Sequence, residues 1–299
     1  MTSRCIDIMG IEHALHLMME PLRRAGQLAE RLQPQIHAQE RVEKGGTTAA
    51  ASALTAADLL LEDLIGVAVL ERFEDASFYG EEHERDRISA FIPDGKRYRI
   101  LLDPINGTLF YRDGLGIYEC ILTICEVLRN GALEQLGVLI YHPRQDRMTY
   151  AFRNPLWQGA CRTRLFKSHE RDATLESFSR VALSPNPSRV IYLGSELEGQ
   201  REAIRQAGFN PIIVTKDYML DGSWSHTLSN ILYGGAAGYW NKRAQIIDSG
   251  AIGFALGCIA DGAVVYGYFN PDTLRFNDLL MFVTEEAQEL LMRLYCAQK

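Results

Sequence analysis

Acidic residues lie at three points where the chain changes direction, and carboxylates at such points can hold a cation. Glu81 and Glu82 follow a short apolar segment and a glycine, in "FYGEEH". Asp103 ends the apolar run "RILLD", and Pro104 fixes the turn after it. Asp248 follows "QII" at a predicted helix start. Hard divalent cations such as Mg²⁺ take oxygen ligands, and carboxylates from separate segments are the usual protein contribution.

Each of these acidic residues also has a purely structural interpretation. An Asp at the end of a strand is often an ordinary turn residue, and Asp248 can act as a helix N-cap and nothing more. Asp58 falls in the first turn of a predicted helix, where a carboxylate complements the helix dipole. No single one of these residues indicates a functional site. The order and context of the four segments that carry Asp58, Glu81 and Glu82, Asp103 and Asp248 favour one.

The elements that must position these residues change in type along the chain. Helical spacing covers residues 10–43 and 55–73, and short strands follow at 99–103, 117–127, 136–142 and 147–152. Asn130-Gly131 predicts a hairpin between two of these strands, so we expect an antiparallel meander and an α+β arrangement. Strands and helices alternate after residue 180, as in an α/β layer, with a small-residue helix at 223–238 and a final helix near Thr284.

This change of pattern predicts two parts. The N-terminal α+β part covers residues 1–175 and carries most of the candidate ligands, whereas the α/β part, residues 176–299, contributes Asp248.

The composition is that of an ordinary globular protein. The 299 residues are 47% hydrophobic and 23% charged, with a formal net charge of −7 and no basic stripe that would track a nucleic acid. No apolar run approaches the length of a membrane span, and the N-terminus does not resemble a secretory leader. We therefore expect a cytoplasmic protein that binds neither nucleic acid nor membrane. The six cysteines form no CxxC pair and no zinc spacing.

The motifs together resemble the inositol monophosphatase family, the lithium-sensitive, Mg²⁺-dependent phosphatases related to fructose-1,6-bisphosphatase. That family carries a Thr-to-Asp segment before a helix, a GEE, a DPIDGT-type motif and a WD-type motif. The chain shows these in the same order, as "LTAAD" (54–58), "GEE" (80–82), "DPINGT" (103–108) and "IID" (246–248). The likeness covers most of residues 40–265. It implies a layered αβαβα sandwich, an α+β and α/β fold, and a homodimer.

The resemblance also implies a role for individual residues in a site for Mg²⁺ and a small phosphorylated metabolite. The implied metal ligands are Glu81, Asp103, the Ile105 carbonyl, Asn106 and Asp248. The residues implied to position and activate the attacking water are Asp58, Thr108 and Glu81. The residues implied to bind phosphate or substrate are Gly107, Thr108, Asn241 and Arg243.

The chain departs from the family at three of its motif positions. Asn106 stands where the family has Asp, Ile247 where it has Trp, and Asn241 where inositol phosphatases carry Glu. An amide oxygen can ligate Mg²⁺ but brings no negative charge, so a weaker second metal site is expected. A purely local interpretation is that Asn106 only tightens its turn through an Asx bond. Three explanations for Asn106 are open. It is an engineered substitution, it belongs to a naturally slow phosphatase, or it marks a scaffold that now serves other chemistry or regulation.

The expected function is that of a Mg²⁺-dependent phosphatase whose substrate is not inositol phosphate. Lys242 and Arg243 beside Asn241 suit an anionic substrate, although a solvated turn explains them equally well. "DGSWSH" (221–226) contains Asp, Ser and His, but residues so close on one helix rarely form a triad. Two alternatives stay open: a repurposed enzyme that eliminates or cyclises with loss of phosphate, and a non-catalytic scaffold.

Overall fold

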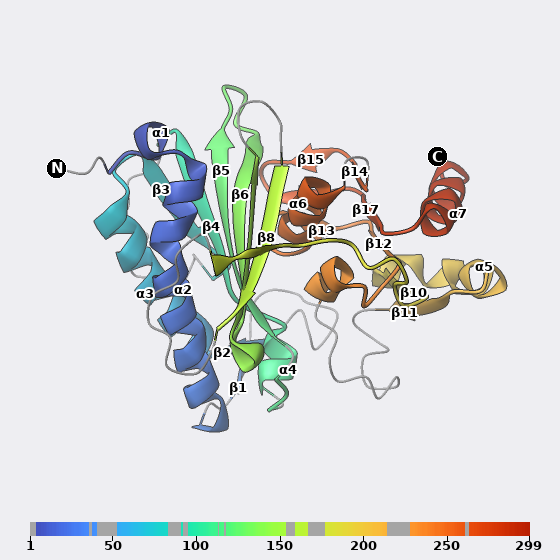
Figure 1. The fold of residues 1–299 in the computed structure, drawn as a ribbon, viewed down its shortest axis with the longest axis horizontal. Coiled ribbons are helices and arrows are strands. Elements are labelled where there is room, and N and C mark those ends of the chain that lie inside the picture. Colours follow the sequence, from blue (N-terminus) through green and yellow to red (C-terminus); the bar gives the residue numbers. More distant parts are fainter. Residues whose placement is uncertain are drawn as a thin grey trace. The chain divides into compact units, whose positions relative to one another are not determined.

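The computed structural model describes residues 4–35, 38–40, 53–82, 91, 95–112, 114–116, 118–153, 159–166, 177–213, 228–260 and 263–299. The chain divides into two compact units, Met1–Arg180 and Val181–Lys299 (Figure 1). "DGSWSH" lies outside the described residues.

A seven-stranded sheet forms the first unit, in the order β3-β4-β5-β6-β7-β8-β9. Its strands are β3 (Ala76–Gly80), β4 (Tyr98–Asn106), β5 (Glu119–Val127), β6 (Leu133–His142), β7 (Arg147–Arg153), β8 (Gly159–Leu165) and β9 (Ser179–Arg180). β3 and β4 are parallel, and every later neighbour pair is antiparallel. The predicted meander is therefore confirmed. Gly131 has φ 80° in the turn between β5 and β6, which explains the glycine there.

Two long helices, α2 (Ile11–Leu32) and α3 (Ala56–Arg72), lie side by side on one face of this sheet (Figure 1). Their apolar side chains pack with those of the strands in one core; its helical members include Leu15, Met18, Leu22, Leu61 and Ile65, and its strand members Ile100, Leu102 and Leu122. The shorter helices of the unit are α1 (Ile6–Met9) and α4 (Thr108–Arg112).

The expectation of one helix over residues 10–43 is wrong at its C-terminal end. α2 ends at Leu32, and Gln33–Gln35 form a 3₁₀ turn. Pro34 has no backbone N–H, so it cannot donate the next hydrogen bond of the α-helix, and the helix ends here. The chain then forms β1 (Ala38–Glu40), which pairs with β2 (Ala53–Thr55). The helix expected at 55–73 is confirmed as α3.

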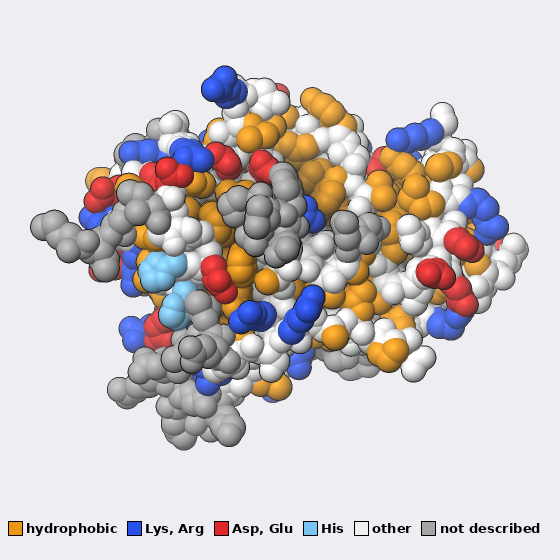
Figure 2. All heavy atoms as spheres, turned by 45° about the horizontal axis from the view of Figure 1, so that its top comes forward, with side chains coloured by type: hydrophobic (Ala, Val, Ile, Leu, Met, Phe, Trp, Pro, Cys, Tyr) orange, Lys and Arg blue, Asp and Glu red, His pale blue; other side chains and the backbone are white. Residues whose placement is uncertain are grey.

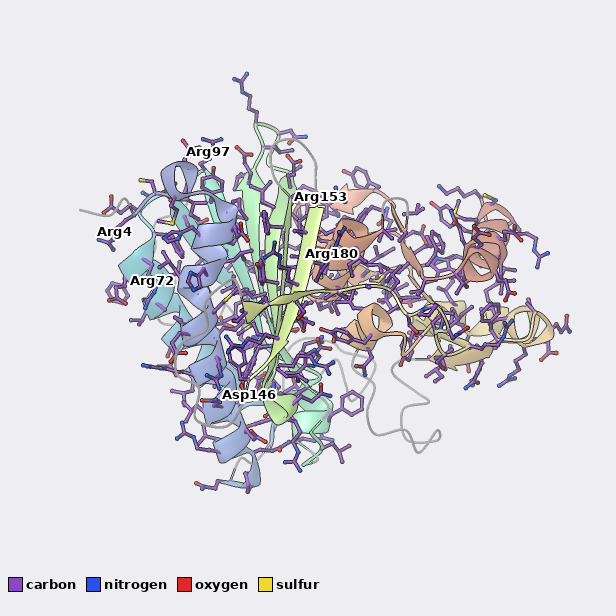
Figure 3. All side chains as sticks on the ribbon, viewed as in Figure 1. Arg4, Arg72, Arg97, Asp146, Arg153 and Arg180 are labelled. Carbon is purple, nitrogen blue, oxygen red and sulfur yellow. The ribbon has the colours of Figure 1, made fainter. Side chains whose placement is uncertain are left out.

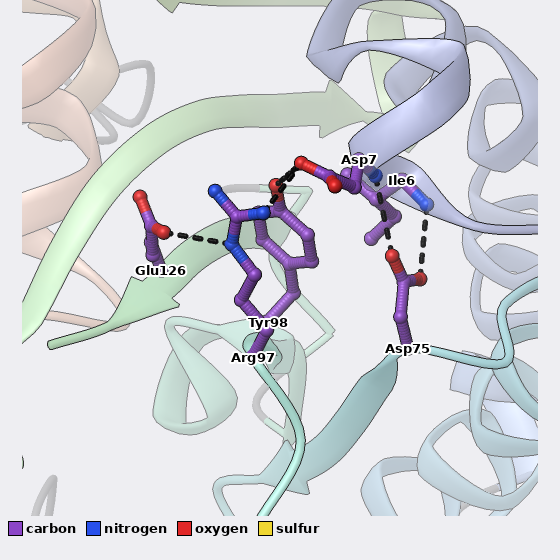
Figure 4. A network of polar contacts seen from close by, with 6 residues as sticks. All are labelled: Ile6, Asp7, Asp75, Arg97, Tyr98 and Glu126. Atoms are coloured by element: carbon purple, nitrogen blue, oxygen red, sulfur yellow. Dashed lines mark hydrogen bonds and ion pairs between the residues drawn. The ribbon is translucent and has the colours of Figure 1, made fainter. Parts of the chain in front are cut away.

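Polar contacts attach α1 to the N-terminal ends of β3 and β4 (Figure 4). The carboxylate of Asp75 accepts from the backbone N–H groups of Ile6, at 2.9 Å, and Asp7, at 3.2 Å. The Arg97 guanidinium donates to Asp7, at 2.5 Å, and to Glu126, at 2.9 Å. These ion pairs are half exposed, so their main effect is to fix the direction of the first helix rather than to add much stability.

A partly buried ion pair joins α2 to the turn between β6 and β7, where Asp146 lies at the lower end of the sheet in Figure 3. Arg23 Nε and Nη2 donate to the two carboxylate oxygens of Asp146, at 2.8 and 2.6 Å. The Tyr141 hydroxyl donates to the same carboxylate at 2.9 Å, and the guanidinium lies 4.1 Å from the centre of the Phe166 ring. Asp146 has φ 45°, a conformation that Asp tolerates in turns. The pair therefore fixes both the turn and the helix over the sheet.

We expect Arg23→Lys to destabilise the first unit by about 1–3 kcal/mol, because the ammonium lacks the planar fork by which the guanidinium donates to both carboxylate oxygens and lies over the Phe166 ring. Urea unfolding followed by far-UV circular dichroism measures the loss. Arg24→Lys is the matched control, since Arg24 is the exposed neighbour and pairs with Glu20 on the helix surface. Equal stability of the two variants would contradict the role assigned to Arg23.

The second unit has a mixed five-stranded sheet in the order β11-β10-β12-β17-β14. The strands are β10 (Val190–Leu193), β11 (Asn210–Ile213), β12 (Gly238–Asn241), β14 (Val264–Tyr266) and β17 (Leu279–Phe282). A small three-stranded sheet comprises β13 (Ala244–Gln245), β15 (Phe269–Asn270) and β16 (Arg275–Phe276). β10 is parallel to both β11 and β12, whereas β17 is antiparallel to its neighbours.

Helices cover both faces of the larger sheet. α5 (Arg201–Gln206) and α7 (Glu285–Cys296) share one core with the strands, through Ile204, Leu290 and Trp240. α6 (Ser249–Ile259) packs on the other face, where Gly253 lies against Leu279.

Most elements expected in this part of the chain are present, with one correction. Thr284 caps α7 by accepting from Ala287 N at 3.2 Å, as the expected final helix requires. The small-residue helix expected at 223–238 is wrong for its described residues. They form a 3₁₀ helix, η6 (Leu228–Tyr233), and then enter β12, because the Gly234-Gly235 pair ends the helix, with Gly234 at φ 84°.

Charges of both signs are interspersed over the described surface in the view of Figure 2. Among the described helices, none combines the length and the apolar character needed to span a bilayer.

Candidate metal and phosphate site

Buried acidic side chains gather at one end of the first unit's sheet. β3 and β4 run in parallel, so their C-terminal ends share an edge, and β5 begins at that same edge. We call this edge, with the start of α3, the acidic end. Its buried carboxylates belong to Asp58, Glu62, Glu82, Asp103 and Glu119. Carboxylates are rarely buried unless hydrogen bonds or a cation compensate them.

The "DPINGT" segment forms the end of β4 and the turn into α4. Asp103 and Ile105 are buried on β4, and the strand register shifts between Asp103 and Asn106. Gly107 has φ 97°, which only glycine adopts readily, and α4 begins at Thr108.

The Thr108 hydroxyl joins three of the residues that the sequence singled out. Its Oγ1 lies 2.9 Å from the Ile105 carbonyl oxygen and 3.3 Å from Asp58 Oδ1, both acceptors. Asp58 lies in the first turn of α3, and both Asp58 and Thr108 are buried. The start of α3 is thus held against the turn that follows β4.

The buried thiol of Cys120 lies near three of these carboxylates. Burial raises the pKa of Cys120 well above its usual value, and the negative charges of Asp103, Glu119 and Asp58 raise it further, in that order. Carboxylates from β4, β5 and α3 therefore act on one sulfur atom, which stays protonated at neutral pH. The same environment, through burial first and Asp58 second, raises the pKa of Tyr111.

Glu81 is positioned by its backbone and by a carboxylate that sequence reasoning missed. Its N–H donates to the Leu102 carbonyl at 2.9 Å, which continues the pairing of β3 with β4. The next N–H, that of Glu82, donates to Glu62 Oε2 at 3.0 Å. A Cβ on Gly80 would lie 1.9 Å from Glu62 Cδ. The glycine of "GEE" is therefore required by the fully buried Glu62 carboxylate beneath it.

We expect Gly80→Ala to destabilise the first unit by about 1–3 kcal/mol, because its methyl group overlaps the buried Glu62 carboxylate, which would have to move and give up its bond to the Glu82 N–H. The thermal unfolding midpoint measures this effect. Gly199→Ala is the matched control, since a Cβ at Gly199 meets nothing within 4 Å. The assigned packing is wrong if both variants unfold at the wild-type temperature.

Glu119 and His142 form a second feature that the sequence analysis did not identify. Glu119 opens β5 and is fully inaccessible, and His142 Nε2 on β6 lies 3.9 Å from its Oε2. Burial lowers the pKa of His142 to about 3, and the charge of Arg147 lowers it further, so the imidazole is neutral above that pH. The sequence did contain a signal for Glu119, because it falls within the apolar run "IYECILTIC". A charged residue is rarely buried on a strand unless its charge is compensated.

The second unit holds Asp248, Asn241 and Arg243, whereas the other predicted site residues belong to the first. Asp248 caps α6, and its Oδ1 accepts from Ser249 N and, at 2.6 Å, from Ser249 Oγ. The Asn241 amide donates to the Tyr239 hydroxyl at 2.9 Å. Burial and then Asp248 raise the pKa of Tyr239, which places this phenol near both residues. Tyr239 therefore links two residues that were identified separately.

The loop after β12 is ordered around Asn241. Its Oδ1 accepts from Arg243 N at 2.8 Å, an Asx turn, and the Arg243 guanidinium lies 3.7 Å from Glu196 on the surface. The positive charge expected at this point is thus partly offset by an acidic neighbour.

The donor types at the acidic end fit a hard divalent cation. They are carboxylates, the Asn106 amide and the Ile105 carbonyl, all oxygen donors. Among the described residues, no group of three or more His, Cys, Asp or Glu side chains is placed to hold a metal ion. Mg²⁺ keeps several waters and is bound through one or two protein carboxylates, so the types of donor present suit it.

The same fold occurs in solved structures, among them a phosphatase. The chain aligns with the extragenic suppressor protein SuhB from Bartonella henselae over 93% of this chain and 96% of that one, at 17% identity and a TM-score of 0.63. An IMPase/NADP phosphatase complexed with NADP and Ca²⁺ aligns over 94% of each chain, at 12% identity and a TM-score of 0.63. The chain has the inositol monophosphatase fold. An inositol monophosphatase family protein from Staphylococcus aureus aligns over 94% of each chain, at 11% identity and a TM-score of 0.64.

The likeness is one of structure rather than of close sequence. No protein-family model matches the sequence, and neither does any curated protein. The expected fold class is confirmed, and the inositol monophosphatase fold provides the frame for the motif residues described above.

Proposed function

We propose that this chain is a Mg²⁺-dependent phosphatase of the inositol monophosphatase family that releases phosphate from a small phosphorylated metabolite. The observation that carries the proposal is the Thr108 hydroxyl, which joins Asp58 to the Ile105 carbonyl beside the buried Asp103. The similar IMPase/NADP phosphatase binds a phosphorylated ligand and a divalent cation, which supports the same substrate class.

When bound, the cation would stabilise the phosphate oxygens electrostatically and would lower the pKa of a water molecule. Asp58 and Thr108 would orient the attacking water. Asp58 Oδ1 would accept its proton as the water oxygen bonds to phosphorus, and the ester oxygen would leave as the alcohol with a proton taken from solvent. Asp103, Glu81 and the Ile105 carbonyl would hold the cation. The N–H groups of Gly107 and Thr108 bind phosphate.

The proposed substrate is anionic and is not inositol phosphate. Asn241 accepts from the chain's own backbone at Arg243 instead of presenting a carboxylate to sugar hydroxyls. Arg243 is exposed and its nearest acidic neighbour, Glu196, is 3.7 Å away, so its guanidinium retains donors for a carboxylate or phosphate. The amide of Asn106 carries no negative charge, unlike the Asp of the family, so it weakens cation binding at the second metal position.

We expect Mg²⁺-stimulated phosphate release from at least one member of a panel of sugar, nucleotide and amino-acid phosphates. Asp103→Asn should lower the rate by about 10²-fold or more, because a carboxylate that holds the cation is worth several kcal/mol in the transition state. A colorimetric phosphate assay measures the rate. Asp7→Asn is the control, since Asp7 is half exposed at the opposite end of β4.

The panel also tests the alternatives. Absence of phosphate release by both the wild type and Asn106→Asp would contradict phosphatase activity. Phosphate release with a product mass other than that of the free alcohol would indicate elimination or cyclisation instead. The homodimer and the cytoplasmic location remain proposals, and light scattering after size-exclusion chromatography tests the first.

A further inference from the structure

We propose that two copies of this chain associate through an apolar stripe on α3, with the two α3 helices antiparallel across a two-fold axis. The apolar stripe consists of Leu60, Leu64, Val67 and Leu70. This inference concerns the outer side of the first unit's helix layer and does not depend on phosphatase activity.

α3 is apolar on two of its sides. One side packs into the core of the first unit through Leu61, Ile65 and Val69. The apolar stripe lies on another side, and its four members are 41%, 44%, 50% and 40% exposed in chain order. Residues three and four apart share one helix face. A surface helix ordinarily turns charged and polar residues toward water, so α3 has the composition of a helix that is covered on both sides.

The charged groups around the apolar stripe balance one another. Every exposed position of α3 from residue 60 to residue 70 carries Leu or Val. Beyond the C-terminal end of the stripe, Arg72 pairs with Glu71 at 2.6 Å. Arg4 pairs with Glu74 at 3.4 Å and also donates to the Leu70 carbonyl at 3.0 Å. The stripe therefore favours a partner that buries apolar surface, rather than a nucleic acid or another highly charged ligand.

A second copy of the same helix is complementary to the apolar stripe. In a two-fold dimer, the same patch is used on both copies. With the helices antiparallel and centred on the stripe, Leu60 of one copy lies opposite Leu70 of the other. Leu64 is next to the midpoint of the stripe, so it lies close to Leu64 of the second copy. The antiparallel arrangement also places the positive end of each helix dipole beside the negative end of the other.

The neighbouring helix α2 contributes the remaining area and a polar rim. A stable interface buries about 800 Å² on each partner, more than the stripe provides along its roughly 15 Å of helix. α2 lies beside α3 (Figure 1), and the two form a layer about 25–33 Å long and about 20 Å wide, which is comparable with that size. The exposed residues of α2 include His13, Arg24 and Arg31. An apolar centre with a charged rim is the usual composition of a protein interface.

The test reverses the character of Leu64 and measures the molar mass by light scattering after size-exclusion chromatography, over a series of protein concentrations. We expect the wild type to be a dimer and Leu64→Glu to halve its molar mass. Leu64→Lys should do the same. Each variant should raise the dimer Kd about 100-fold or more, because two like charges face each other in an apolar centre. Glu and Lys are good helix formers, so α3 is retained.

An equimolar mixture of Leu64→Glu and Leu64→Lys separates self-pairing from every other occupant of the stripe. Because Leu64 lies close to its own copy, opposite charges face each other in the mixed dimer, and the dimer mass should return. Leu165→Glu is the matched control. Leu165 is 57% exposed at the end of β8, so the same substitution there should leave the molar mass unchanged.

The other outcomes overturn the proposal. A dimer that Leu64→Glu leaves intact has its interface elsewhere. A monomeric wild type has no such interface, and a fall in its thermal midpoint in Leu64→Glu would indicate that the same chain covers the stripe. Two monomeric variants whose mixture stays monomeric would contradict the two-fold arrangement. Far-UV circular dichroism verifies folding, and if a Leu64 variant does not fold, Leu70→Lys, which should also halve the molar mass, decides.

Discussion

The burial of negative charge at one end of a sheet is the constraint on which the site depends. Five carboxylates lie at the acidic end of the first unit, and Glu62 and Glu119 are fully inaccessible. Burying a charged carboxylate is unfavourable by several kcal/mol unless hydrogen bonds or a cation compensate it. Glu62 is compensated locally by the Glu82 N–H, and this bond requires a glycine at position 80. The local geometry of the "GEE" segment thus follows from a residue one helical turn beyond Asp58.

The fold was predictable from the sequence wherever apolar periodicity and turn residues agree. The meander from β4 to β7 follows from alternating runs and from Asn130-Gly131, and α3 and α7 follow from helical spacing. Predictions failed where a local conformational limit overrides a favourable composition. α2 ends near Pro34, although the polar residues that follow have a sequence typical of a helix. Gly234-Gly235 ends the 3₁₀ helix, and the small-residue stretch continues into β12. In both places a single backbone constraint outweighs side-chain propensity.

The site was predictable only in part, and for a physical reason. Motifs identify residues that lie close in sequence, so "DPINGT" indicated Asp103, Asn106 and Thr108, and the structure brings Thr108 to Asp58. Glu62, Glu119 and Tyr239 belong to no motif, because their roles arise from helix packing or strand register. Register is not visible in a linear sequence, since a shift of one residue would place Glu119 on the opposite face.

The Asn106 substitution has a different meaning once register is considered. In the linear sequence, an amide in place of a carboxylate is a loss of charge, and a degraded metal site follows. In the sheet, the strand partner of that amide is an inaccessible glutamate, which an ordinary sheet core would exclude. Two carboxylates facing each other at positions 106 and 119 would repel, so Asn is the residue that a glutamate at 119 favours. The charge at this point of the sheet is therefore set by both positions of the strand pair together.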